Sequence, residues 1–124
     1  MTPRSAVLAY GIGRMAFGAA LFATPSTVGR LLLNAEATPH TTSALRAYGT
    51  RDLVIGAGVV ASVQRGRDPS PFLAAGIASD ALDTTAQLID WRHLPPDRRV
   101  PGLVFAIGAG VVGRVLLRAV ATGR

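Results

Sequence analysis

The sequence predicts an all-α protein, a bundle of four membrane-spanning helices, and three observations predict it. Hydrophobic residues make up 49% of the 124 residues and charged residues only 16%, whereas about a quarter of the residues of soluble domains are charged. The eight prolines leave four long segments free of proline, and proline breaks helix interiors. No segment alternates apolar and polar residues as a half-buried strand would. A chain of this length is expected to form one domain, residues 1–124.

The proline-free segments set the expected spans. Each can hold a helix of about 20 residues, which crosses a hydrocarbon core about 30 Å thick. The four segments cover residues 4–24, 40–68, 72–94 and 102–124.

The first span is expected over residues 5–23. Arg14 interrupts its apolar run, so we interpret it as part of the mature protein and not as a cleavable signal. After Pro25, residues 26–33 are short and amphipathic, which is typical of a helix that lies at the membrane interface.

The second span is expected to begin with a cap at Thr41, Thr42 or Ser43 and to end near Gln64. Residues 65–68 then form a tight polar turn.

The third and fourth spans follow the same logic. Ser70 and Pro71 predict an N-cap and a first-turn proline, and Trp91 ends the third span as an interface anchor. Residues 92–100 are expected to be a connection, and the fourth span is expected over residues 101–121.

A soluble four-helix bundle is the alternative fold. The longest uncharged stretches, residues 15–29, 100–113 and 53–64, fall short of the roughly 18 apolar residues that identify a span by themselves. Residues 53–63 and 103–112 nevertheless lack the polar outer stripe that a soluble bundle helix needs. This absence favours the membrane.

Small residues recur at helical spacing, as in closely packed membrane helices. A general abundance of Gly and Ala explains any one row equally well. The rows are Gly102, Ala106 and Gly110; Ala75 and Ser79; and Ala9 and Gly13.

Six charges lie near the midpoints of the four spans. A rise of 1.5 Å per residue puts them in a slab on the order of 10 Å thick. An isolated charge at mid-membrane costs about 3 kcal/mol, so we expect them to pair. We expect Arg51 to reach Asp80 or Asp83, and Asp52 to pair with Arg14 or Arg114.

This charged layer is the candidate site. Asp80 and Asp83, three residues apart, share one helix face, and two carboxylates so close in low dielectric cannot both ionise easily, so one is expected to hold a proton. Such a centre can protonate an oxygen, as in epoxide opening, cyclisation or isomerisation of a lipophilic molecule. The candidate catalytic residues are Asp80, Asp83, Arg51, Asp52 and Tyr48, and the candidate ligand-binding residues are Arg14, Gln87 and Arg114.

Two other functions stay open for the same layer. Its charges can be a structural network that fixes helix register in a non-catalytic module. They can also carry protons in a transporter subunit, in which case a chain this short is expected to form a homodimer.

Composition excludes several classes of site. There is no cysteine, and His40 and His93 have no ligand-spaced partner, so neither a metal nor a cofactor is expected. No phosphate loop or dinucleotide fingerprint is present. The 13 arginines are scattered, so the net charge of +6 is assigned to lipid head groups and not to nucleic acid.

The chain resembles small four-span membrane proteins of the DoxX-like type, closest to members of unknown function. The resemblance rests on Arg14, Gly18, Pro25 and Arg30, on the run 46–53 with Gly56, and on Asp80 and Asp83; its most specific part is Gly49-x-Arg51-Asp52-Leu53. The resemblance implies a four-helix membrane fold and no established activity.

The expected location is the cytoplasmic membrane of a bacterium. The basic residues are all arginine in a chain rich in Ala, Gly and Val, which indicates a GC-rich bacterial genome. Arginines on the side of the termini outnumber those on the other side by one, which favours cytoplasmic termini. The two sets are Arg4, Arg65, Arg67, Arg118 and Arg124, against Arg30, Arg92, Arg98 and Arg99.

Overall fold

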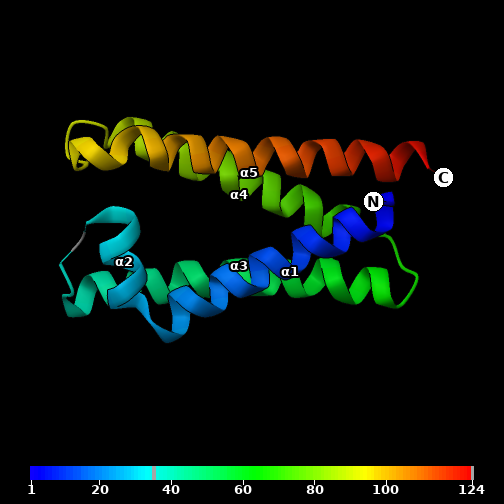
Figure 1. Ribbon diagram of the computed structural model, residues 1–124, viewed down its shortest axis with the longest axis horizontal. Helices are drawn as coiled ribbons and strands as arrows, with labels where there is room; N and C mark the ends of the chain where they lie inside the picture. Colours follow the sequence, from blue (N-terminus) through cyan, green and yellow to red (C-terminus); the bar gives the residue numbers. More distant parts are fainter. Residues whose placement is uncertain (35, 124) are drawn as a thin grey trace.

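The computed structural model describes residues 1–34 and 36–123, which form five α-helices and no strand. The all-α prediction is therefore confirmed. The helices are α1 (Pro3–Ala23), α2 (Pro25–Leu33), α3 (Pro39–Gln64), α4 (Ser70–Ile89) and α5 (Pro96–Thr122). Figure 1 shows four long helices running along one axis, with the short α2 across one end and both chain termini at the other.

Every helix has a proline at its first or second residue, because the missing N–H of proline costs nothing in the first turn. Thr2 caps α1 by accepting a hydrogen bond from the Ser5 amide. The cap of α3 is Thr38, before the expected Thr41–Ser43 positions, and Thr38 and Thr41 form a reciprocal capping box. At α4, Ser70 is the first helical residue and Pro69 the N-cap, so the expected Ser70 cap is wrong.

The start of α5 also differs from expectation. The helix begins at Pro96, within the expected connection, and encloses Pro101. Pro101 lies in the second turn, where its missing N–H removes a single bond to the Asp97 carbonyl. The preceding helix ends at Ile89 with Asp90 as its C-cap, so Trp91 lies just outside it.

The four long helices pack as two antiparallel pairs, α1 with α3 and α4 with α5. Glycines seven residues apart allow the close contact of the first pair. A Cβ on Gly18 would meet the backbone of Gly49, and a Cβ on Gly56 would meet the backbone of Gly11. The expected Ala9–Gly13 row is wrong, because the space next to Gly13 is open. The rows facing one another carry their glycines in opposite chain order, as antiparallel packing requires.

Three layers follow one another between the two pairs. An apolar core lies at the end with the termini, formed by Val7, Val59, Val63, Leu73 and Leu116. A layer of buried charges occupies the middle. A cavity covered by α2 lies at the far end.

The outer surface is apolar. Large hydrophobic side chains are exposed on all five helices, among them Val54 at 59% and Leu82 at 69%. Two helices, α1 and α5, are long and apolar enough to cross a membrane, and only 28% and 17% of their apolar windows are buried. The core helix of a soluble protein would be mostly buried, so this exposure weakly favours association with a membrane.

Candidate functional site

Arg14 of α1 is the centre of the buried half of the charged layer. Its guanidinium holds Asp80 of α4 with two hydrogen bonds, of 2.6 and 3.1 Å, and reaches Asp52 of α3 at 3.2 Å. The same guanidinium donates to the Tyr10 hydroxyl at 2.6 Å. The side chains of Arg14, Asp52 and Asp80 are 8%, 7% and 6% exposed. This half is closed to the outside.

Glycine makes room for this arrangement. A Cβ on Gly76 of α4 would lie 2.5 Å from Arg14 Nη1 and 2.7 Å from the Tyr10 hydroxyl. Sequence reasoning missed both Gly76 and Tyr10. The spacing of Tyr10 four residues before Arg14 was the available signal, since such residues are neighbours on a helix.

Arg51 of α3 is the centre of the more open half. Its two terminal nitrogens donate to the two oxygens of Asp83 at 2.9 and 2.8 Å, and one also reaches Asp52 at 3.3 Å. The Tyr48 hydroxyl donates to Asp83, and the Arg51 guanidinium lies 4.1 Å from the centre of the Tyr48 ring. The Arg51 and Asp83 side chains are 30% and 14% exposed, so this half is the more accessible.

The predicted pairing is confirmed in its main features. Arg51 reaches Asp83, and Asp52 is paired by Arg14 and also contacts Arg51. Asp80 and Asp83 do not form a carboxylate pair around one arginine, because each has its own guanidinium. Arg114, the other expected member, is exposed and outside the layer.

The charge count of the layer leaves one carboxyl in excess. Two guanidinium groups face three carboxyl groups, Asp52, Asp80 and Asp83. A neutral layer therefore needs one proton on a carboxyl, because an uncompensated charge buried in an apolar bundle is expensive. The Nε atoms of Arg14 and Arg51 are also buried without a hydrogen-bond partner.

The cavity over the open half measures about 440 Å³ and is mostly apolar. All five helices contribute to its wall. Tyr48, Asp83 and Gln87 are its polar members on α3 and α4, and Arg98 is its polar member on α5. The apolar lining is Phe17, Leu21, Leu31, Leu32, Leu33, Leu45, Ala86, Leu94, Pro95, Pro101, Gly102 and Phe105.

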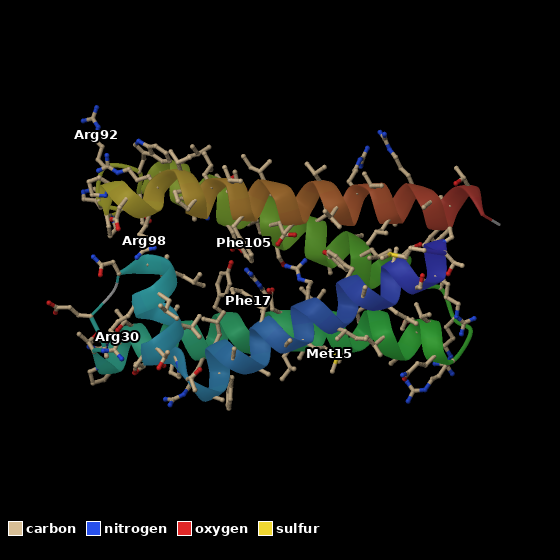
Figure 2. The ribbon with its side chains drawn as sticks, in the orientation of Figure 1. Met15, Phe17, Arg30, Arg92, Arg98 and Phe105 are labelled. Atoms are coloured by element: carbon tan, nitrogen blue, oxygen red, sulfur yellow. The ribbon has the colours of Figure 1, made fainter. Side chains whose placement is uncertain are left out.

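An aromatic pair closes the wall between α1 and α5. The Phe17 and Phe105 rings lie 5.4 Å apart, centre to centre. Figure 2 shows the two side chains pointing toward one another between the helix pairs. The three leucines of α2 form the opposite cover, and Leu31 remains 65% exposed, so a lipophilic molecule can approach from that side.

The predicted site residues fall into three groups. Asp83, Tyr48 and Gln87 line the cavity. Asp80, Asp52, Arg14 and Arg51 lie behind that wall as partners within the charged layer. Arg114 has no contact with either.

A larger hollow of about 660 Å³ lies at the opposite end of the bundle, next to the termini. It is lined by Arg4, Arg67 and Asp68 among apolar residues and contains no member of the charged layer. The cavity under α2 is the better candidate because it joins an apolar volume to convergent polar groups.

Within residues 1–34 and 36–123, no cluster of three His, Asp or Glu side chains could hold a metal ion. The fold and the site thus define an all-helical protein with two apolar candidate spans and a buried Arg–Asp network beside a cavity. Comparison with known proteins adds no family: no protein-family model matches the chain, and neither does any curated protein or any solved structure.

Proposed function

We propose that the chain is an integral membrane protein with four spans, α1, α3, α4 and α5. The charges near the middle of α3 and α4 point into the bundle, where Asp52 and Asp80 are 5% and 4% exposed. Their outer faces carry Val54 and Leu82. The inward charges lower the average apolarity of these two helices without exposing a charge to lipid. Intramembrane charges of this kind face the bundle interior and pair with one another.

Arg114 fits the same proposal. It lies on α5 about two turns before the helix ends at Thr122. A long arginine side chain at this depth can extend along the helix so that its charge reaches the head groups. Arg114 then joins the side of the termini, and Arg46, which donates to the Phe22 carbonyl at the other end of the bundle, joins the opposite side. The arginine counts become six and five, so the balance still favours cytoplasmic termini by one charge.

The DoxX-like resemblance remains part of the proposal, and its most specific run has a physical role in this chain. Gly49 lies against Gly18 of α1, and Arg51 and Asp52 join the charged layer. The run thus combines close helix packing with the charges that cross between the helix pairs.

The proposed activity is the binding of a lipophilic small molecule in the cavity under α2. One observation carries it: the open half of the charged layer, Tyr48 and Asp83, forms part of the wall of an otherwise apolar cavity of about 440 Å³. Ligand pockets typically measure about 300–1,000 Å³, with mostly apolar walls and a few placed polar groups. A carbonyl, hydroxyl or epoxide oxygen of the ligand would lie against Tyr48 and Asp83.

The same pair can act on the ligand by proton transfer. Tyr48 gives a proton to the ligand oxygen, Asp83 takes one from a neighbouring position of the ligand, and that proton returns to the Tyr48 oxygen along the hydrogen bond between the two side chains. Isomerisation and cyclisation return the proton in this way, so the atoms balance without a second substrate. Arg51 acts as a positioning residue, since it holds both oxygens of Asp83.

The buried half supports a structural function for the rest of the layer. Arg14 satisfies Asp80, Asp52 and Tyr10 at once and reaches no cavity. Removal of one partner from such a buried pair leaves an uncompensated charge. We assign these residues to assembly of the two helix pairs.

The test compares two variants in which an alanine of α4 is replaced by phenylalanine. Ala86 lines the cavity, whereas Ala81 is exposed and outside it. Ala86→Phe should fill the cavity. Methyl laurate and laurate should raise the melting temperature of the detergent-purified protein, and this variant should need at least about tenfold more of either ligand for the same rise. Ala81→Phe should leave the required ligand concentration unchanged. Equal stabilisation of both variants would contradict binding in this cavity.

A further inference from the structure

The inference concerns the head group of the ligand and rests on the function proposed above. The two charged residues of the cavity wall, Asp83 and Arg98, differ in how well the protein neutralises them. Asp83 is neutralised by Arg51 and hydrogen-bonded by Tyr48. The other charged wall residue, Arg98, contributes a guanidinium to the α5 side.

Arg98 is poorly satisfied by the protein. Its Nε is buried without a hydrogen bond, although it lies 3.3 Å from an oxygen of the adjacent Asp97. The Asp97 side chain is 63% exposed, so water screens that contact. Among the described residues, Arg98 has no other acidic partner. The Arg98 side chain is 37% exposed, so its terminal nitrogens are accessible to a ligand, and no hydrogen bond within the described residues occupies them.

The neighbouring Arg99 is held by the chain through two hydrogen bonds. It donates to the Leu94 and Arg92 carbonyls and lies over the Trp91 ring, which fixes the connection between α4 and α5. The two adjacent arginines therefore differ: Arg99 holds the cavity wall in place and Arg98 is available to a ligand.

Depth separates Arg98 from the acid–base pair. Arg98 lies in the first turn of α5, whereas Asp83 lies about two turns inside the end of α4. Figure 2 shows Arg98 pointing from α5 toward α2, whereas Arg92 points away from the bundle. An anion at Arg98 would lie near the membrane surface, and the body of the ligand would extend on the order of 10 Å inward to Tyr48 and Asp83.

We propose that Arg98 binds the anionic head group, a carboxylate or phosphate, of a single-chain or ring-shaped amphiphile whose body fills the cavity under α2. A guanidinium is suited to this task because its fork of donors matches both kinds of anion. The leucines of α2 cover the apolar body, and the oxygen function of the ligand lies at Tyr48.

The experiment measures binding to the purified full chain by native mass spectrometry, which counts bound molecules directly. The probes are laurate, lauryl phosphate, uncharged methyl laurate and dioleoyl phosphatidylglycerol. We expect one laurate or lauryl phosphate per chain, and at least tenfold weaker binding of methyl laurate. Binding of phosphatidylglycerol in place of laurate and lauryl phosphate would overturn the single-chain ligand, because two oleoyl chains exceed a cavity of about 440 Å³.

Arg98→Gln is compared with Arg92→Gln, which removes the same charge from the same end of the bundle. Arg98→Gln should weaken the binding of the anionic probe by at least tenfold. Arg92→Gln should change the affinity for that probe less than twofold. Equal losses in both variants, binding of the ester as tight as the acid, or no binding of any anionic probe would overturn the proposal.

The outcomes separate this inference from the proposed function. If methyl laurate binds as well as laurate and both are lost in Ala86→Phe, the cavity binds lipophiles and only the anionic head group is wrong. If no probe depends on residue 86, the cavity function itself fails. Circular dichroism of each variant confirms that the helices are retained.

Discussion

The two halves of the charged layer are built from the same parts. Each joins an arginine of the α1–α3 pair to an aspartate of α4 through two hydrogen bonds, and each adds a tyrosine hydroxyl from one turn before the arginine. Arg14 and Asp80 are closed off, whereas Asp83 and Tyr48 open to a cavity. The difference teaches that exposure, and not residue type, separates a structural ion pair from a candidate site.

The largest difference between the halves should appear when each aspartate is made neutral. Asp80→Asn should lower the free energy of unfolding by about 2–3 kcal/mol, because Arg14 keeps its contact with Asp52 but the asparagine NH2 cannot accept the second Arg14 hydrogen bond, whose donor then stays buried. Asp83→Asn should cost less, about 1–2 kcal/mol, since Arg51 is partly exposed and keeps its contact with Asp52. Thermal unfolding in detergent measures both.

For ligand binding we expect the opposite order from that for stability, because Asp83 lines the cavity and Asp80 does not. Asp83→Asn should weaken binding of a lipophile that carries an oxygen function, and the folded fraction of Asp80→Asn should bind normally. Equal stability losses in the two variants would show that both halves are structural.

A smaller loss of stability is expected when a methyl group is added to the buried half of the charged layer. Gly76→Ala places a Cβ against Arg14 Nη1 and the Tyr10 hydroxyl, so the free energy of unfolding should fall by about 1–3 kcal/mol. Gly108→Ala is the control, because nothing lies within 4 Å of its Cβ position. It should be neutral or slightly stabilising, since alanine favours helix. Unfolding of the two variants at the same temperature would disprove the tight packing described around Arg14.

The smallest effect should come from the tyrosine hydroxyls. Tyr10→Phe and Tyr48→Phe each remove one hydrogen bond to the charged layer, a loss of about 0.5–1.5 kcal/mol in the free energy of unfolding. Only Tyr48→Phe should also weaken ligand binding, because only Tyr48 lines the cavity. A parallel titration of the two variants with 12-hydroxylaurate, whose hydroxyl lies at the end of the chain opposite its carboxylate, checks this, and a larger binding loss in Tyr10→Phe would contradict the assignment of the open half.

Much of this architecture follows from the chain alone. Proline positions predicted the helix starts to within a few residues, except at α5, where Pro101 is tolerated in the second turn. Residue spacing placed Arg14, Asp52 and Asp80 at one depth, because the rise per residue of a helix is fixed. The cost of an unpaired charge in an apolar environment then predicted that these side chains meet.

Tertiary structure alone decided which charges pair and which of them reach a cavity. Asp80 and Asp83 share a face of α4, yet they bind different arginines, because the glycine contacts between α1 and α3 set Arg14 and Arg51 side by side. Arg114 has a similar depth but points outward, since its neighbour Gly113 occupies the buried face of α5. Spacing along one helix fixes depth and direction about that helix, whereas the rotation of one helix against another depends on contacts between residues far apart in the chain.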